Sequence, residues 1–411
     1  MSVILITLFI SLPVVAIACG LSLDFDNEGW KYGSDSAEKS FINYDNGIEK
    51  LIISRTFETS PKGSVWVIPI PSNPNLIKVD VLTDIPTYYG YNVSEKAKDN
   101  IENIKNALLA TQLYTLSSIV ELLMPSYLVG GSLTTGGNLA DFEGVSRDVT
   151  VYDHLEKSGM VVEILSAKNS DALYNYLKEK GLTVERDSIE ILQDYIGNDF
   201  SLVASWVRST APRKSAKGVL MTFPTDYIYY PLKPGSVYSG DGLPEAITVL
   251  GHVTPKLYDD IKNDTYVNYF YSKGGKSTEG FFSTDKGFSY TEIVIDTKPS
   301  NLTEDLRIRT STPIKIKNAM ILNTSTFVYG LLLLLLISSI ATLIVSRMLK
   351  LKLQNSTLLA LSIANSLTLL GTIIGARLFL KEKRFVFVVL FSITFVLTTL
   401  VICFGLLRLY T

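Results

Sequence analysis

The stretch SVWVIPIP, residues 64–71, is the clearest guide to the fold. Its β-branched and aromatic residues favour a strand, and Trp66 can bury a large ring beneath that strand. Pro69 and Pro71 each remove a backbone donor, both on the same side of the strand. The stretch therefore predicts a strand that lies at a sheet edge, or leaves the sheet at the prolines, over a packed core. An edge that binds a peptide or a glycan is the alternative.

Further strand-like segments surround this stretch, and helical patterns interrupt them. Residues 42–57 and 77–82 have the composition of strands, and more strand-like segments follow between residues 149 and 295. Helical patterns begin at Ser94 and at Ser170. Because strands and helices mix without a regular βαβ alternation, the sequence predicts an α+β region that is β-rich with a few helices.

This α+β region is predicted to contain two subdomains. The segment GGSLTTGGN, residues 130–138, has the composition of a flexible connection. It would separate a first subdomain, residues 19–129, from a second, residues 139–297. Residues 298–325 would then form a juxtamembrane linker.

The N-terminal segment, residues 1–18, reads MSVILITLFISLPVVAIA and is apolar. It ends in Ala16-Ile17-Ala18, and small residues at these positions are typical of a signal-peptide cleavage site. A lipid-modified Cys19, an uncleaved N-terminal anchor and a buried strand are the alternatives. The signal peptide and the uncleaved anchor both place the following region outside the cytoplasm.

The C-terminal part, residues 326–408, is strongly apolar. It contains three stretches long enough to cross a bilayer as helices, at about 327–346, 358–376 and 385–407. The sequence therefore predicts a three-helix transmembrane bundle that follows a large extracytoplasmic region. We expect a multi-pass protein of the cell membrane.

Basic residues bear on the orientation of these spans. Arg347, Lys350 and Lys352 follow the first span and fit a cytoplasmic loop. The second loop would then lie outside, although it carries four bases that the positive-inside rule would place inside. The number and orientation of the spans therefore stay open. These four bases are Arg377, Lys381, Lys383 and Arg384.

The net charge of −2 conceals an asymmetry between the two parts of the chain. From Thr326 onward, eight of the 38 Lys and Arg and one of the 40 Asp and Glu occur, so this part is near +7. The remaining thirty bases and thirty-nine acids leave the first part near −9. An acidic region argues against a nucleic-acid partner, and a basic apolar tail suits a lipid membrane with anionic head groups.

Small residues recur on one face of the predicted middle span. They are spaced by three or four residues, which keeps them on one side of a helix. Two of them form a GxxxG element, and such stripes let membrane helices approach closely. The pattern predicts that this helix packs on other helices, within the chain or in another subunit. The residues are Ala360, Ala364, Thr368, Gly371 and Gly375.

The segment DFDNEG near the N-terminus is the best metal candidate. Asp24, Asp26, Glu28 and Asp35 offer carboxylate oxygens with a spacing that imitates a calcium loop. Glu28 and Asp35 depart from the pattern of that loop, and a solvated acidic turn is the alternative. Calcium is the one cofactor that the sequence suggests.

No recognisable catalytic motif accompanies these features. The two histidines, His154 and His252, stand in no metalloprotease or nucleophile-elbow motif. Tyrosine is abundant at 22 residues, with clusters at residues 88–91, 227–230 and 266–271, and exposed tyrosine favours binding surfaces. This composition favours a binding module over an enzyme, so no catalytic residue is predicted.

Several of these segments together resemble a known family. The element WVIPIP, the segment VTVYDHLEKSGMVVEIL at 149–165 and the segment GVLMTFPTDYIYYPL at 218–232 are similar to an uncharacterised prokaryotic envelope family, domain of unknown function 2330. The resemblance covers residues 19–255 in patches. It implies a secreted or membrane-tethered location, a structural role for Trp66, Pro69 and Pro71, and no known activity.

We therefore predict a non-enzymatic binding or scaffolding protein of the cell envelope. Its partner would be an envelope protein or a glycan, or a second copy of the chain. An envelope hydrolase that uses carboxylates is one alternative. The other is a subunit of a membrane complex whose helical bundle is the working part.

Overall fold

The computed structural model divides the chain into two compact units, which are described separately. The first contains residues 1–92 and 132–313, and the second contains residues 93–131 and 314–411. The residues that the structure describes are 21–26, 29–32, 39–57, 65–113, 148–182, 184, 186–207, 215–237, 245–277, 280–282, 287–350, 354–367, 389–390, 393–394 and 397.

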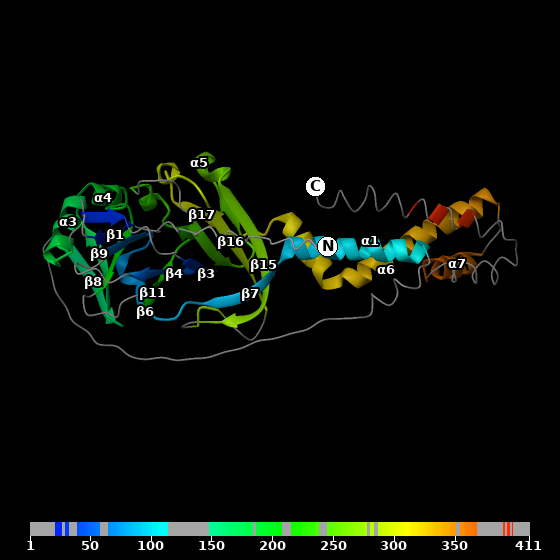
Figure 1. The fold of residues 1–411 in the computed structure, drawn as a ribbon, viewed down its shortest axis with the longest axis horizontal. Coiled ribbons are helices and arrows are strands. Elements are labelled where there is room, and N and C mark those ends of the chain that lie inside the picture. Colours follow the sequence, from blue (N-terminus) through cyan, green and yellow to red (C-terminus); the bar gives the residue numbers. More distant parts are fainter. Residues whose placement is uncertain are drawn as a thin grey trace, which may run out of the picture. The chain divides into compact units, whose positions relative to one another are not determined.

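The first unit is built from three sheets, here called sheets A, B and C (Figure 1). Sheet A has the order β2 (Gly29–Tyr32), β1 (Leu21–Asp26), β5 (Val65–Ile70), β10 (Ser201–Val207), β9 (Met160–Ala167) and β8 (Val149–Lys157). Sheet B has the order β6 (Lys78–Leu82), β11 (Ser215–Pro224), β4 (Ile48–Phe57), β3 (Lys39–Asp45), β13 (Glu245–Leu250), β16 (Phe288–Ile295), β15 (Thr265–Lys276) and β7 (Thr87–Asn92). Sheet C has the order β12 (Ile228–Tyr230), β17 (Leu306–Arg309) and β14 (Thr254–Lys256). Among the strand pairs that the structure describes, β3–β13 is the parallel one.

Short helices complete the first unit, and long helices make up the described part of the second. The first unit contains α3 (Ser170–Glu179), α4 (Arg186–Glu190) and α5 (Asp259–Lys262), with 3-10 turns at Pro74–Leu76, Ile191–Asp194, Lys233–Val237 and Pro299–Asn301. The second unit contains α1 (Val93–Leu113), α6 (Ile314–Met348) and α7 (Asn355–Leu367). The β-rich α+β architecture that the sequence predicted is confirmed.

Strand β5 lies between two hydrophobic cores. Trp66 and Ile68 pack into a core shared by sheets A, B and C. Val65 and Val67 point the other way, into a core that α3 and α4 cover (Figure 1). Successive strand residues face opposite sides, so all six residues of β5 are buried. The continuous apolar run in the sequence reflects this double burial.

Pro69 lies near the end of β5, and Pro71 directly follows the strand. Strand β10 pairs with β5 from Val65 to Ile70. Strand β1 pairs with Val65, Trp66 and Val67 and, among the described residues, goes no further. Val65–Val67 are paired on both sides, so this half of β5 is central and not an edge, and the strand ends at Ile70, directly before Pro71. The residues that would continue β1 opposite Ile68–Ile70 lie outside the described residues, so the edge prediction for this half stays a prediction.

The structure divides the chain differently from the sequence prediction of two subdomains. Strand β5, from the predicted first subdomain, pairs with β10, from the second. Strand β4 likewise pairs with β11, and β3 pairs with β13. Strands from before and after residues 130–138 thus share sheets A and B, because their apolar faces form one core.

The predicted linker, residues 298–325, contains regular structure. Strand β17 is the central strand of sheet C, and its Leu306 and Ile308 are buried. Helix α6 begins at Ile314, well before the predicted start of the first span at 327. The linker prediction was wrong because β17 has only four residues, too few for its alternation to stand out.

We predict that Trp66→Ala destabilises the first unit by about 3–5 kcal/mol, because the buried ring would leave a cavity in the shared core. Thermal unfolding of the full-length chain in detergent measures this loss. Trp66→Phe, which keeps an aromatic ring, should lose less. An unchanged melting temperature for Trp66→Ala would contradict the core role of the ring.

Candidate functional site

Helix α6 carries exposed apolar side chains. Residues Val328–Met348 form a 21-residue segment with a mean hydropathy of 2.6, and this is the one helix among the described residues that is long and apolar enough to cross a membrane. Leu332 and Leu336 on this segment are 56% and 57% exposed. A core helix of a water-soluble protein would bury such side chains. The first predicted span, 327–346, corresponds to this segment.

Helix α6 is kinked just before the apolar segment, at Ser325, whose φ and ψ are −136° and 26°. Helix α1 packs beside α6 (Figure 1). The Asn323 amide donates to the Val93 carbonyl at 3.0 Å and accepts from the Asn100 amide at 2.9 Å. Asn100 is buried, and an unpaired amide there would be costly, so this asparagine pair fixes the register of the two helices.

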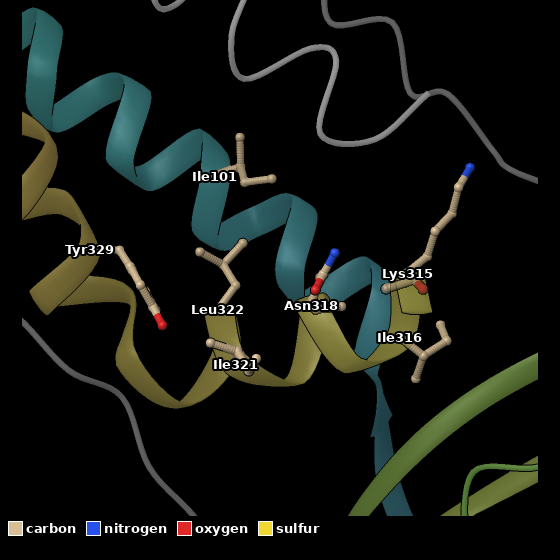
Figure 2. A pocket seen from close by; sticks show the side chains of 9 residues that line it. Ile101, Lys315, Ile316, Asn318, Ile321, Leu322 and Tyr329 are labelled. Carbon is tan, nitrogen blue, oxygen red and sulfur yellow. The ribbon is translucent and has the colours of Figure 1, made fainter. Parts of the chain in front are cut away.

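A cavity of about 350 Å³ lies between the same two helices. Figure 2 shows Ile101 of α1 and Leu322, Ile321 and Tyr329 of α6 around it. Its size is at the lower end of small-molecule sites, and its lining offers apolar contact without an acid or a histidine. The complete lining is Ser94, Ile101, Lys315, Ile316, Asn318, Ala319, Ile321, Leu322 and Tyr329.

Segments of all three predicted spans pack together. Ala341 and Val345 of α6 form a buried cluster with Leu361 of α7 and with Leu390. The Asn365 amide of α7 donates to the Thr394 hydroxyl at 3.0 Å, and both side chains are buried. Most residues of the third predicted span, 385–407, lie outside the described residues, as does the second half of the span at 358–376.

The small-residue stripe is described only at its start. Ala360 and Ala364 are half-buried, whereas the most buried positions of α7 are Leu361, Ser362 and Asn365. The first two small residues therefore flank the packed face. Thr368, Gly371 and Gly375 lie outside the described residues, so the packing role of the stripe stays a prediction.

Two adjacent tyrosines of β12 organise buried polar groups in the first unit. The Tyr230 hydroxyl donates to Glu245 of β13 and lies 2.8 Å from the Ser40 hydroxyl of β3. The Tyr229 hydroxyl donates to Asp305 at 3.0 Å. Strand β12 thus links sheet B to the segment that precedes β17.

Asp305 is the acceptor at the centre of one of these networks. It also accepts from the Tyr195 hydroxyl and from the Lys233 backbone N–H, each at 3.0 Å. Burial raises the pKa of Asp305, and the hydrogen bonds from Lys233, Tyr195 and Tyr229 oppose that rise. This carboxylate joins three segments of the chain, which is a structural role.

Glu49 of β4 is a second buried carboxylate. Its side chain is 0% exposed, and its Oε2 accepts from the Tyr229 backbone N–H at 2.8 Å. Its Oε1 is buried with no hydrogen-bond partner among the described residues. Burial raises the pKa of Glu49 well above 4.5, which favours the neutral form.

A third polar network surrounds Glu163 on β9. Glu163 is 1% exposed and accepts from His154 Nδ1 at 2.8 Å, from Lys180 Nζ at 2.9 Å and from the Tyr176 hydroxyl at 2.5 Å. His154 and Glu163 are directly opposite each other on β8 and β9. Lys180 also lies over the Trp206 ring at 6.0 Å. The network joins sheet A to α3, and it gives His154 a buried hydrogen-bond partner, Glu163.

The second histidine has a structural environment as well. His252 Nε2 lies 2.9 Å from the Phe270 carbonyl, and its own carbonyl accepts from Thr312 at 2.9 Å. Burial lowers the pKa of His252. The two histidines therefore occupy separate networks, and the structure brings neither to the cavity between α1 and α6.

The tyrosine clusters have mixed roles. Tyr88 packs against the rings of Phe41, Phe288 and Tyr290 in the core on the outer face of sheet B. Tyr89, next to it on β7, is 79% exposed, and Tyr266 on β15 is 62% exposed. Only part of the tyrosine-rich sequence is thus available to a binding partner.

The calcium candidate is described in part. The backbone of Asp24 and Asp26 belongs to β1, which forms a hairpin with β2, and Asp24 is opposite Lys31. Glu28 and Asp35 lie outside the described residues, so calcium binding stays a prediction. Within the described residues, no group of three His, Cys, Asp or Glu side chains could hold a metal ion.

Sequence reasoning missed the buried carboxylates Glu49, Glu163 and Glu245 and the half-buried Asp305. Each lies in or next to a strand, and Glu163 interrupts the apolar run MVVEILSA of β9. A polar residue within an apolar run was the sequence signal that could have predicted a buried, hydrogen-bonded carboxylate. Their partners could not be inferred, because they come from distant parts of the chain.

Comparisons with known proteins add little to this geometry. No family model and no curated protein matches the chain. Two crystal structures of a mutated baculovirus P35 after caspase cleavage are similar to it, at 10% and 11% identity, and cover 67% and 63% of this chain and 99% and 97% of those chains. Their TM-scores are 0.24 and 0.22, and at such values the likeness carries no argument about fold or function.

We predict that Glu49→Gln changes how stability depends on pH. The unfolded chain ionises Glu49 near pH 4.5, whereas the folded chain holds the proton to higher pH. The stability that the neutral carboxyl contributes is fully present below pH 4.5 and is lost as pH rises through the folded-state pKa. The unfolding free energy of Glu49→Gln should therefore increase relative to that of the wild type as pH rises.

Denaturant unfolding of the full-length chain in detergent, from pH 4 upward, measures this difference. The matched control is Asp45→Asn, which changes an exposed carboxylate on the neighbouring strand. It should follow the wild-type dependence. A constant difference between Glu49→Gln and the wild type at all pH values would contradict the prediction.

Proposed function

We propose that this chain is a membrane-anchored extracytoplasmic protein of the cell envelope whose β-rich unit binds or scaffolds a partner without catalysis. The observation that carries the proposal is the exposed apolar surface of Val328–Met348. Exposure of such a surface to water is unfavourable in free energy, whereas an apolar exterior is expected of a helix in a bilayer. The resemblance of WVIPIP and its neighbours to an envelope family points the same way.

We infer further that the anchor is a three-helix bundle that makes the protein multi-pass. The packing of Leu361 and Leu390 against α6 supports this view, as does the buried Asn365–Thr394 hydrogen bond. A polar pair between apolar segments is typical of membrane helices that contact each other. The basic residues after the first span, Arg347 and Lys350, support a cytoplasmic first loop and an outer β-rich unit.

The binding role rests on the surface of sheet B. Strand β7 is the last strand of that sheet, and its Tyr89 is exposed. An edge strand with an exposed tyrosine offers backbone donors and a large amphipathic ring to an envelope protein or a glycan. The raised-pKa carboxylates, the buried Glu49 and the half-buried Asp305, line no part of the described cavity, which favours binding over hydrolysis.

A second candidate function follows from the Asn365–Thr394 pair. Polar side chains within membrane segments often mark the working part of a membrane protein. The chain would then be a subunit of a membrane complex, and the β-rich unit would be its outer cover.

Topology reporters test the anchor. Fusions of a cytoplasm-specific and an export-specific reporter should place Thr411 inside and residues 380–384 outside in the wild type. We predict that Leu332→Arg with Leu336→Arg inverts both readings, because each arginine costs about 2.5–3.5 kcal/mol at the centre of a span. With the first span disabled, the two remaining spans would insert in the opposite sense.

The matched control is Ile314→Arg, which changes an exposed apolar residue of the same helix ahead of the apolar segment. It should keep the wild-type readings. If the double variant keeps them too, Val328–Met348 is not a membrane span. If the wild type already shows residues 380–384 inside, the three-span arrangement is wrong.

A further inference from the structure

We propose that α1 is a second membrane-inserted helix, which enters the bilayer beside α6 from the side of the β-rich unit. This inference rests on the proposed membrane anchor. Its evidence is the register of α1 against α6 and the distribution of charge along both helices.

The two helices run in the same direction. Asn323 of α6 contacts Val93 and Asn100 of α1. Further along both helices, Ile104 Cγ1 lies 3.7 Å from the Cβ position that a side chain at Gly330 would occupy. Ile104 also forms a buried cluster with Ile337. Increasing residue numbers on α1 thus meet increasing numbers on α6.

This register places the end of α1 beside the apolar segment of α6. Ile104 is level with Gly330, two residues after the segment begins at Val328. Helix α1 continues for nine more residues, to Leu113, or about 13 Å at the rise of an α-helix. That length would take α1 well into one leaflet of a bilayer.

The charge of α1 ends close to the level at which the apolar segment of α6 begins. Helix α1 carries six charged residues between Glu95 and Lys105, and the chain then has none from Asn106 to Val120. Helix α6 carries Lys315 and Lys317, and then no charge until Arg347. Lys105, the last charge of α1, follows Ile104 and is therefore level with the first residues of the apolar segment, as expected for a helix that enters lipid beside that segment.

The connections of α1 define the kind of insertion. Strand β7 ends at Asn92, directly before α1, and the chain returns to the same unit in β8 at Val149. Because the chain leaves and rejoins one unit, α1 enters the bilayer without transferring the chain to the other side. The partner of this surface is therefore the lipid of the leaflet next to the β-rich unit.

Spin labels in reconstituted vesicles test the inference. The full-length chain, with Cys19 and Cys403 replaced by serine, receives a single label at Asp99→Cys or Ala110→Cys. Eleven residues, about three helical turns, separate these two positions, so they share a face of α1. A third variant, Leu336→Cys, reports the exposed surface of α6. Collision rates with oxygen, which partitions into lipid, and with a water-soluble nickel complex are compared.

We expect nickel accessibility at Ala110 to fall to the level at Leu336, with high oxygen accessibility, while Asp99 stays open to nickel. If Ala110 behaves like Asp99 while Leu336 is shielded from nickel, α1 stays outside the bilayer and the inference is wrong, although the anchor stands. If neither reagent reaches Ala110, the end of α1 is enclosed by protein, which also overturns the inference. If nickel reaches Leu336, the membrane anchor itself fails.

Discussion

The burial of strand β5 on both faces is the constraint on which the β-rich unit depends. Trp66 and Ile68 enter the core shared by the three sheets, while Val65 and Val67 enter the core beneath α3 and α4. A shift of one residue along β5 would exchange the two sets and place the indole in the wrong core. The register of β10 against β5 is therefore fixed by packing on two sides, and β9 and β8 follow from β10.

Apolar packing alone would allow more than one arrangement of the strands around the shared core. The buried polar groups favour a single arrangement. Tyr229 and Tyr230 are adjacent on β12, so their side chains point in opposite directions, to Asp305 and to Glu245. An unpaired hydroxyl or carboxylate in this interior would cost about 1–3 kcal/mol, so sheet C must pair with its neighbours in one arrangement. Glu49, with one oxygen on the Tyr229 backbone, adds a group whose charge state affects the same junction.

Local sequence was sufficient to predict the strand at residues 64–71, the burial of Trp66, the α+β class and the first apolar segment. Each of these follows from composition and periodicity within one short window. The central position of Val65–Val67 could not be predicted, because it depends on a hairpin formed by β1 and β2. The single core could not be predicted for the same reason, since it requires β3 to pair with β13, where Ser40 is opposite Ile247. Of the candidate site, the apolar surface of α6 was predictable, whereas the contact of α1 with it required the structure.

Both units combine apolar contacts with a few buried polar pairs, but the apolar contacts contribute differently in each unit. In the β-rich unit, many apolar contacts supply stability, and a few buried polar pairs select one arrangement. In the helical unit, lipid would offer the apolar side chains nearly the same environment as the protein, so apolar contact alone selects little. The asparagine pair of Asn100 and Asn323 and the Asn365–Thr394 pair are then the contacts that lipid could not replace. The Asn100–Asn323 pair fixes the register of α1 against α6 before the apolar segment begins. That register determines how much of α1 lies beside the apolar segment.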